Sequence, residues 1–322
     1  MFALRRLLAS LGTVVAASIL VFAMARLIPG DPASIMLGSQ GISNPDIVEQ
    51  YRREYSLDQP LPAQYATWAW KALHGDFGRS IAERGPVLPL IVERLGHTAV
   101  LALSAALLAS VLGVLVGTAG ALSAPARPAV DRILTLLSVA GIAAPQFGVG
   151  LFLVVVLAVQ YPLFPVLGMH TPGREDVPDL VWHLVLPTVT LAIHPAAVVA
   201  RLVRTNVLEV LSQPYVRTAH AKGLPERLVF YDHALRNALL PIVTTLGLMT
   251  GSFLGGAVLI ETIFAWPGLG YLMLNALGAR DYPVIQGITL IVSVTYVSAN
   301  LIVDASYGLL DPRVRLAGRH GG

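Results

Sequence analysis

The sequence predicts an all-α membrane protein that crosses the bilayer six times. Hydrophobic residues make up 55% of the 322 residues, and only 13% are charged. A soluble protein would have roughly a quarter of its residues charged. The mean hydropathy is +0.69. Six apolar stretches are each about 20 residues long, enough to cross a hydrocarbon core of about 30 Å as a helix.

The first apolar stretch covers residues 7–25 and is flanked by arginines on both sides. Ala23-Met24-Ala25 fits the cleavage pattern of a signal peptide, which is the alternative interpretation. The apolar region of a signal peptide is about 7–15 residues long, however, and this stretch is longer. We therefore expect residues 1–30 to be an uncleaved transmembrane helix that ends at Pro29-Gly30.

Residues 31–96 differ in composition from the rest of the chain. They contain six basic residues, repeated Pro and Gly, and the pair Trp68 and Trp70. Tryptophan concentrates where membrane proteins meet the lipid headgroups. We expect an extracytoplasmic segment with two short amphipathic helices, at residues 50–57 and 63–73.

The remaining five apolar stretches form a predicted membrane core at residues 97–310, followed by a tail at 311–322. The five spans are expected at residues 97–122, 133–159, 183–200, 238–260 and 284–303. Small residues spaced four apart allow close helix packing. We expect such packing at Gly113 and Gly117, and at Gly247, Gly251 and Gly255. Three prolines are expected to kink the spans that contain them: Pro145, Pro187 and Pro195.

The distribution of positive charge predicts which side of the membrane each loop occupies. An even number of spans places both termini on one side. With the termini in the cytoplasm, residues 1–8, 123–132, 201–236 and 309–322 are inside and carry 13 Lys and Arg. The opposite segments, 31–96, 162–182 and 263–284, carry 8, with one in each of the two short loops. Short cytoplasmic loops are enriched in Lys and Arg, so we expect cytoplasmic termini.

The longest polar interruption of the core lies in the predicted cytoplasmic loop at 206–236. Its Tyr215–Lys222 segment has no helix breaker, and a helix there would place Tyr215, Ala219 and Lys222 on one face. Gly223 is a typical C-terminal cap, and Pro225 suits the first turn of a second helix. Two short helices would form a compact projection for a soluble partner. The alternative is an ordinary basic cytoplasmic loop.

Several motifs in this chain resemble those of ABC importer permeases of the dipeptide, oligopeptide and nickel branch. TAHAKG at residues 218–223, followed by ALRNALLP at 234–241, resembles the cytoplasmic EAA loop of that family. Thr218 stands where the wider superfamily has Glu, and His220 replaces a common Arg. Further similar motifs, in the family's order, are PGDP at 29–32, LDQPL at 57–61, GDFG at 75–78, ETIFAWPGLG at 261–270, RDYP at 280–283 and DPR at 311–313.

The resemblance implies a type I ABC importer permease fold and a location in the bacterial inner membrane. It also implies a second permease subunit, two ATP-binding subunits and an extracytoplasmic solute-binding protein as partners. The residues it assigns to coupling with the ATPase are Tyr215, Arg217, Thr218, Ala219, His220, Ala221, Lys222 and Gly223. The chain has no GxxxxGK[ST] motif, so we expect ATP and Mg²⁺ to be bound by the partner ATPases and this chain to be no enzyme.

The other polar residues of the core have structural or pore-lining interpretations. Gln146 and Phe147 follow the break at Pro145, and we interpret them as candidate pore-lining residues. We expect Glu261 to anchor the turn at 264–270 and Asp304 to be paired near the inner face. His170, His183 and His194 lack the i,i+3 or i,i+4 spacing of a helical metal site, so we expect no bound metal.

Composition excludes several functions and leaves the substrate open. The chain has no cysteine, which excludes disulfides, thiolate metal sites and cysteine nucleophiles. Its basic residues lie at span ends, so the pI of 9.3 does not indicate a nucleic-acid partner. The resemblance favours di- or oligopeptides as cargo, with nickel, a nickel chelate or glutathione as alternatives. An ion-driven secondary carrier and an intramembrane enzyme are alternatives of other classes, but neither midplane carboxylates nor a catalytic motif supports them.

Overall fold

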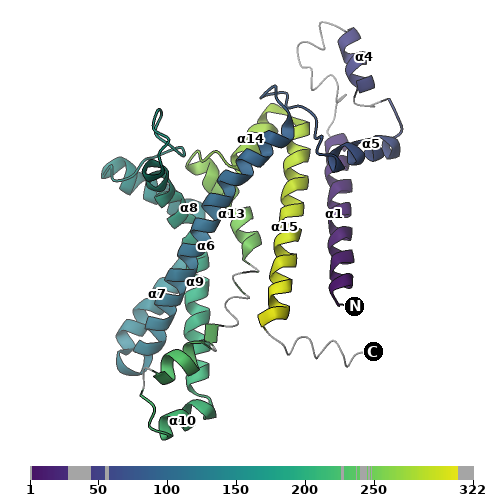
Figure 1. Ribbon diagram of the computed structural model, residues 1–322. Coiled ribbons are helices and arrows are strands. Elements are labelled where there is room, and N and C mark those ends of the chain that lie inside the picture. Colours follow the sequence, from purple (N-terminus) through teal and green to yellow (C-terminus); the bar gives the residue numbers. More distant parts are fainter. Residues whose placement is uncertain are drawn as a thin grey trace. The chain divides into compact units, whose positions relative to one another are not determined.

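The structure is a computed structural model, and it is built of helices (Figure 1). It describes residues 2–27, 45–54, 58–225, 228–236 and 249–310, together with residues 238, 239, 245 and 247. The only β-type contacts in these ranges are two isolated bridges, Arg79 with Pro86 and Thr171 with Arg174. The predicted all-α class is confirmed. The chain divides into two compact units, residues 1–97 with 268–301 and residues 98–267 with 302–322.

The helices follow the predicted order, with several shifts in their bounds. They are α1 (Phe2–Leu27), α4 (Pro45–Glu54), α5 (Leu61–Leu73), α6 (Val87–Ala126), α7 (Pro128–Ala143), α8 (Gln146–Leu153), the π-helix η1 (Val154–Gln160), α9 (Val177–Leu211), α10 (Pro214–Ala221), the π-helix η2 (Val229–Leu235), α13 (Thr250–Ile263), α14 (Leu269–Ala279) and α15 (Tyr282–Leu310). Helix α6 begins ten residues before the predicted span, so residues 87–96 are helical rather than part of an irregular outer segment. The first short helix also lies earlier than expected, at Pro45–Glu54.

Three helices in the described ranges are long and apolar enough to cross a bilayer. They are Val87–Ala124, Val177–Leu211 and Tyr282–Ile302. The pair formed by Pro128–Ala143 and Gln146–Gln160 also qualifies, but it is bent by 103° at the break between its helices. The apolar part of α1, Leu8–Ala23, is shorter, and much of the predicted span 238–260 lies outside the described residues. The count of six spans and the cytoplasmic termini therefore stay predictions.

In the first unit, α5 packs against α1 through aromatic side chains. The Tyr65 ring lies edge-on to Phe22, with centroids 5.5 Å apart, and Trp68 lies 5.8 Å from the same ring. The hydroxyl groups of Tyr65 and Ser18 are hydrogen-bonded at 2.8 Å. Trp70 points to the other side and is 66% exposed. Helix α5, predicted at residues 63–73, is thus confirmed as an amphipathic helix that covers α1.

A buried carboxylate in the same unit joins the RDYP motif to the loop after GDFG, about 200 positions earlier in the sequence. Asp281 is 1% exposed and lies immediately before α15. Its Oδ2 accepts hydrogen bonds from Ser80 Oγ at 2.6 Å, from the Ile81 N–H at 2.9 Å and from the Ala82 N–H at 3.1 Å. The RDYP motif therefore holds the loop that follows GDFG, with three donors on one oxygen.

The second unit is built around a close contact between α6 and α9. A Cβ atom at Gly113 would lie 2.6 Å from Cβ of Val199, and one at Gly117 would lie 2.6 Å from Cβ of Val203. Real side chains never approach so closely, so only glycine fits at these two positions. The expected small-residue packing is confirmed here.

The second predicted small-residue ladder, at Gly247, Gly251 and Gly255, is wrong at its last position. A Cβ at Gly255 would meet nothing within 4 Å, whereas one at Gly256 would lie 3.2 Å from both Gln146 Oε1 and Leu191 Cδ1. The close approach of α13 is thus one residue further along than expected. The surroundings of Gly247 and Gly251 lie outside the described residues.

The predicted break at Pro145 is confirmed, whereas the kinks predicted at Pro187 and Pro195 stay predictions. Ala144 has an extended backbone (φ −70°, ψ 128°), as residues before proline tend to have, and the helices on the two sides of the break are bent by 103°. Helix α9, in contrast, continues through Pro187 and Pro195 for 35 residues, about 52 Å at 1.5 Å per residue. Asp176 caps its start by accepting a hydrogen bond from the Asp179 N–H at 2.9 Å.

Helix α9 is also tied to α7 by a bidentate ion pair. Arg204 donates from Nε to Asp131 Oδ1 at 2.6 Å and from Nη2 to Asp131 Oδ2 at 2.7 Å. The two side chains are 29% and 14% exposed. Bidentate pairs fix orientation as well as distance, so this contact sets the rotation of α9 relative to α7.

We expect Gly117→Ala to separate α6 from α9 and to lower the stability of the protein. Overpacking of a tight contact typically costs about 1–3 kcal/mol. The matched control is Gly96→Ala in the same helix, where a Cβ meets nothing within 4 Å. Thermal unfolding in detergent should show a lower midpoint for Gly117→Ala and an unchanged or higher one for Gly96→Ala. Equal midpoints for the two variants would contradict the close contact.

We expect Asp281→Ala to release the loop at residues 79–86. The substitution leaves two backbone N–H groups and a buried hydroxyl without their acceptor. Each buried polar group without a partner lowers the stability by about 1–3 kcal/mol. Trypsin should then cut after Arg79 or Arg84 faster than in the unchanged protein. Asp76→Ala is the control, because it removes one exposed hydrogen bond to the Gly78 N–H. A loop as resistant in Asp281→Ala as in Asp76→Ala would rule out the anchoring role.

Candidate functional site

The candidate site is the short helix α10, which follows the end of α9 (Figure 1). The turn between the two helices is held by hydrogen bonds from the Ser212 N–H to Glu209 O at 3.1 Å and from the Gln213 N–H to Val210 O at 3.1 Å. Pro214 occupies the first turn of α10, where its missing N–H has no cost. These hydrogen bonds and Pro214 therefore fix where α10 starts and how it is oriented relative to the end of α9.

The C-terminus of α10 is closed by a complete Schellman motif. The Gly223 N–H bonds to His220 O at 2.9 Å, and the Leu224 N–H bonds to Ala219 O at 3.4 Å. Gly223 has φ +77°, which favours glycine, and a Cβ there would meet nothing within 4 Å. The predicted glycine cap is confirmed.

Helix α10 is fastened to the protein by a small apolar cluster. Val216 is 1% exposed, Ala219 is 8% exposed, and both pack with Val229 of η2. Leu224, Leu211 and Val210 complete the cluster. The backbone resumes helical hydrogen bonding at Pro225, whose carbonyl accepts from the Leu228 and Val229 N–H groups. The predicted second helix is confirmed over residues 228–236, most of it as the π-helix η2, while its role in a projection for a partner stays a prediction.

The predicted partner-facing face is wrong for one of its three residues. Tyr215 and Lys222 are exposed, but Ala219 faces the interior. Val216 is the strongly apolar residue of α10, and burying it also turns Ala219, three positions later, toward η2. The small side chain of Ala219 lets α10 approach η2 rather than an external partner. The spacing of Val216 and Ala219, two apolar residues three positions apart, is the sequence signal that indicates this buried face.

The remaining predicted residues of the site lie on the open side of α10. Arg217, Thr218, His220, Ala221, Lys222 and Gly223 are all exposed, together with Tyr215. Thr218 Oγ1 donates to Pro214 O at 3.1 Å, so its hydroxyl is turned toward its own helix. The open side thus presents an aromatic ring and basic groups, with small residues at its end.

The segment after α10 links this projection to the packed helices. Phe230 of η2 is 6% exposed and packs in a cluster with Val199, Val203 and Val207 of α9. Ala121 of α6 and Ala238 belong to the same cluster. Helix α10 is therefore joined to α9 at both of its ends, once through the chain and once through η2. A force on α10 passes to α9 and, through the glycine contact, to α6.

The candidate pore-lining residues lie at the start of α8. Phe147 is 53% exposed, while Gln146 is half-buried with its Oε1 facing Gly256 of α13. Their role in lining a pore stays a prediction.

Glu261 is fully buried, and its carboxylate accepts a hydrogen bond from Thr98 Oγ1 at 2.6 Å. Its backbone carbonyl accepts a hydrogen bond from the Trp266 N–H at 2.8 Å. The carboxylate of Glu261 is thus bound to Thr98 of α6, while its anchoring of the turn at 264–270 stays a prediction. Asp304 lies outside the described side chains.

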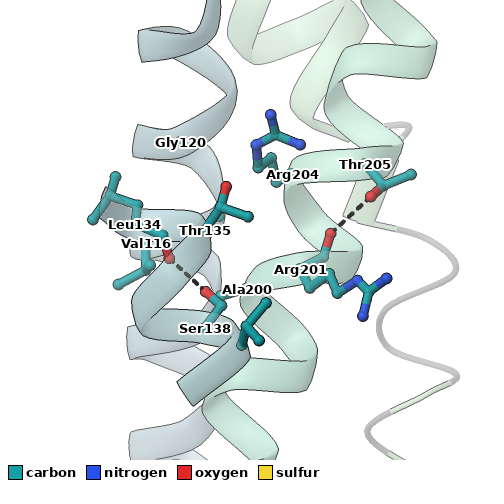
Figure 2. A pocket seen from close by; sticks show the side chains of 11 residues that line it. Val116, Gly120, Leu134, Thr135, Ser138, Ala200, Arg201, Arg204 and Thr205 are labelled. Carbon is teal, nitrogen blue, oxygen red and sulfur yellow. Dashed lines mark hydrogen bonds between the residues drawn. The ribbon is translucent and has the colours of Figure 1, made fainter. Parts of the chain in front are cut away.

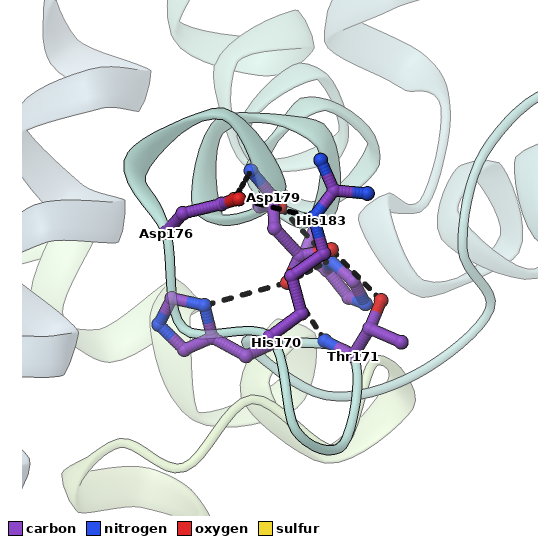
Figure 3. Close-up of polar contacts among 6 residues, drawn as sticks. His170, Thr171, Asp176, Asp179 and His183 are labelled. Atoms are coloured by element: carbon purple, nitrogen blue, oxygen red, sulfur yellow. Dashed lines mark hydrogen bonds and ion pairs between the residues drawn. The ribbon is translucent and has the colours of Figure 1, made fainter.

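Two of the three histidines discussed above meet at one carboxylate (Figure 3). Asp179 Oδ2 lies 3.4 Å from His170 Nδ1 and 3.6 Å from His183 Nδ1, and it accepts from the Thr171 N–H at 2.7 Å. His194 lies apart, with Nδ1 3.2 Å from Ile142 O. In the described part of the chain, no three His, Asp or Glu side chains lie together in a way that could hold a metal ion. Asp179 thus holds the loop at His170 and Thr171 against the first turns of α9.

Asp176, next to this cluster, is held in its charged form. The N–H of Asp179 and the guanidinium of Arg174 lower the pKa of the Asp176 carboxyl below its ordinary value. The charged carboxylate is the form that caps α9, so the start of the helix keeps its cap at neutral pH.

Comparison with known proteins matches nearly the whole chain. Residues 109–316 match the family "Binding-protein-dependent transport system inner membrane component", and residues 1–102 match its N-terminal family. The oligopeptide transport system permease protein AppB of Bacillus subtilis is 41% identical over 97% of this chain and 98% of its own. The dipeptide transport system permease protein DppB of Escherichia coli is 39% identical over 98% of each chain. The solved structure of an amino acid ABC transporter with histidines has a TM-score of 0.50 at 17% identity, covering 70% of this chain and 94% of that one.

We expect Gly223→Val to loosen α10, because a β-branched residue is strained at positive φ. The left-handed conformation costs a residue with a Cβ about 1–2 kcal/mol. Amide hydrogen exchange of α10 should accelerate by roughly 5–30-fold. Gly223→Asn is the control, since asparagine tolerates this conformation, and it should exchange nearly as slowly as the unchanged protein. Equal exchange in all three proteins would show that the cap does not hold the helix.

Proposed function

Because this chain belongs to the family of binding-protein-dependent transport system inner membrane components, we propose that α10 couples it to a separate ATPase and that its cargo is a short peptide. The protein is a multi-pass permease subunit of an ABC importer in the bacterial inner membrane. The observation that carries the coupling proposal is the geometry of α10. It is an exposed helix whose buried side is fixed to α9 and η2.

The proposed partners follow from what this chain lacks and what α10 offers. The sequence has no ATP-binding GxxxxGK[ST] motif, so two separate subunits would bind ATP and Mg²⁺. A second permease would complete the pore, and an extracytoplasmic binding protein would deliver the cargo. The exposed Tyr215, Arg217 and Lys222 suit a groove with aromatic and acidic groups on an ATPase.

The mechanism requires a helix that moves without bending relative to its membrane spans. Closure of the ATPase pair would displace α10, and the apolar cluster around Val216 would transmit the displacement to α9. The α6–α9 contact at Gly113 and Gly117 leaves no space for sliding. The Arg204–Asp131 pair carries the motion to α7. Several helices would then rotate together, as in rigid-body switching.

The proposed cargo is a di- or oligopeptide. The two relatives at about 40% identity are named as oligopeptide and dipeptide permeases, and both align over almost their full length. No feature of the described residues favours nickel or glutathione over a peptide. An ion-driven carrier is a weaker candidate, because the buried Glu261 is engaged with Thr98 and serves the turn at Trp266.

We expect Lys222→Glu and Arg217→Glu to reduce peptide uptake by about tenfold each, equivalent to roughly 1.4 kcal/mol of docking energy. The reversed charges would repel the acidic groups of the ATPase, while the fold of α10 is kept. Uptake of a labelled dipeptide into cells, measured alongside the amount of protein in the membrane, checks this.

Arg132→Glu is the matched control, because Arg132 is exposed on the same predicted side of the membrane but does not belong to α10. It should leave uptake unchanged. Normal uptake by both α10 variants would overturn the coupling role of this helix. Uptake driven by this chain alone in liposomes under an ion gradient would overturn the importer mechanism itself.

A further inference from the structure

A cavity of about 310 Å³ lies between α6, α7 and α9, away from α10 (Figure 2). Its polar lining comes from Arg201, Arg204 and Thr205 of α9 and from Thr135 and Ser138 of α7. Its floor is formed by small or apolar residues, among them Gly117, Gly120 and Ala200. The cavity is large enough for a small polar group and is open on one side.

The two arginines of the cavity have different electrostatic surroundings. Arg204 is neutralised by Asp131 through the bidentate pair described above. Arg201 is exposed, and no carboxylate is among the residues that line the cavity in the described part of the chain. The lining therefore carries one uncompensated positive charge, which favours an anion.

Two of the three hydroxyl groups that line the cavity, those of Ser138 and Thr205, offer acceptors rather than donors. Ser138 Oγ donates its hydrogen to Leu134 O at 2.9 Å, and Thr205 Oγ1 donates to Arg201 O at 3.0 Å. Their lone pairs remain available to a ligand that carries hydroxyl groups of its own. A ligand with both an anionic group and hydroxyl groups would satisfy this lining.

The polar cavity continues into an apolar one on the same three helices. The second cavity has a volume of about 210 Å³ and shares Val116, Leu134, Ser138 and Ala200 with the first. Its other walls are apolar, including Leu112 of α6, Leu137 of α7 and Ile193 of α9. Since Ile193 precedes Arg201 by two turns of α9, the apolar cavity lies further from the end of the helix.

The position of Arg201 along α9 matches the level of the lipid headgroups. Residues 184–200 contain no Asp, Glu, Lys or Arg, and Arg201 is the first charged residue after them. The apolar cavity therefore lies at the depth of the acyl chains and the polar cavity at their headgroups. The bias of Lys and Arg among the loops assigns this end of α9 to the cytoplasmic leaflet.

We infer that these joined cavities bind one anionic phospholipid of the inner leaflet, with its phosphate at Arg201 and an acyl chain along Leu137 and Ile193. A glycerol headgroup fits best, because its hydroxyls would donate to Ser138 and Thr205. Basic pockets between helices on the cytoplasmic side are suited to anionic lipid headgroups. The bound lipid would fill the gap between α7 and α9 next to the Arg204–Asp131 pair.

Native mass spectrometry of the full-length protein, purified with its co-purifying subunits, tests the inference with phosphatidylglycerol and phosphatidylethanolamine as probes. We expect one retained phosphatidylglycerol and about fivefold weaker retention in Arg201→Ala. Arg132→Ala removes a charge at the same end of α7 outside the cavity, and it should retain the lipid. Leu137→Trp keeps Arg201 but fills the apolar cavity, and it should also weaken retention.

Four results would overturn the inference. Equal retention of both lipids, or equal retention by Arg201→Ala and Arg132→Ala, would mean that no specific headgroup site exists. Displacement of the lipid by glycerol phosphate, which has no acyl chain, would assign the cavity to a free phosphate compound. Loss of lipid on assembly of the second permease would assign the cavities to a subunit contact.

Discussion

The contact between α6 and α9 is the constraint on which the second unit depends. A Cβ atom at Gly117 would lie too close to the Ala200 carbonyl oxygen of α9, and one at Gly113 would lie too close to the side chain of Val199. Two helices at this distance can move only together, because close-packed interiors have no space into which to slide. Helix α9 leads directly into α10, and η2 returns to α9 through Phe230. Helices α10, η2, α9 and α6 are thus connected by continuous packing, as the proposed coupling would require.

The sequence predicts the parts of this arrangement that have a local physical cause. The helix contact at Gly113 and Gly117 could be predicted because small residues four apart permit close approach of two helices. The helix end at Gly223 and the new helix after Pro225 could be predicted because helix ends have particular backbone requirements. The fold class followed from the length and polarity of the apolar stretches.

Other features depend on tertiary contacts that local patterns do not contain. Ala219 turns inward because Val216 packs against Val229, a residue in another helix. Gly256 rather than Gly255 lies at the α13 contact, since the rotation of that helix is set by Gln146 and Leu191. The pairing of Asp281 with Ser80 joins residues 201 positions apart, a separation that no local pattern spans.

The rigid attachment of α10 to its membrane spans can be measured directly, and the chain has no cysteine to interfere with labelling. Spin labels would be placed on cysteines at His220 of α10 and Leu115 of α6, both exposed and both in the second unit. Their separation would be recorded in the assembled transporter with and without bound ATP. The account predicts the same narrow distance distribution in both states, since the two helices move as one body. A distribution that shifts or broadens when ATP binds would show that α10 moves independently of the spans and would contradict the account.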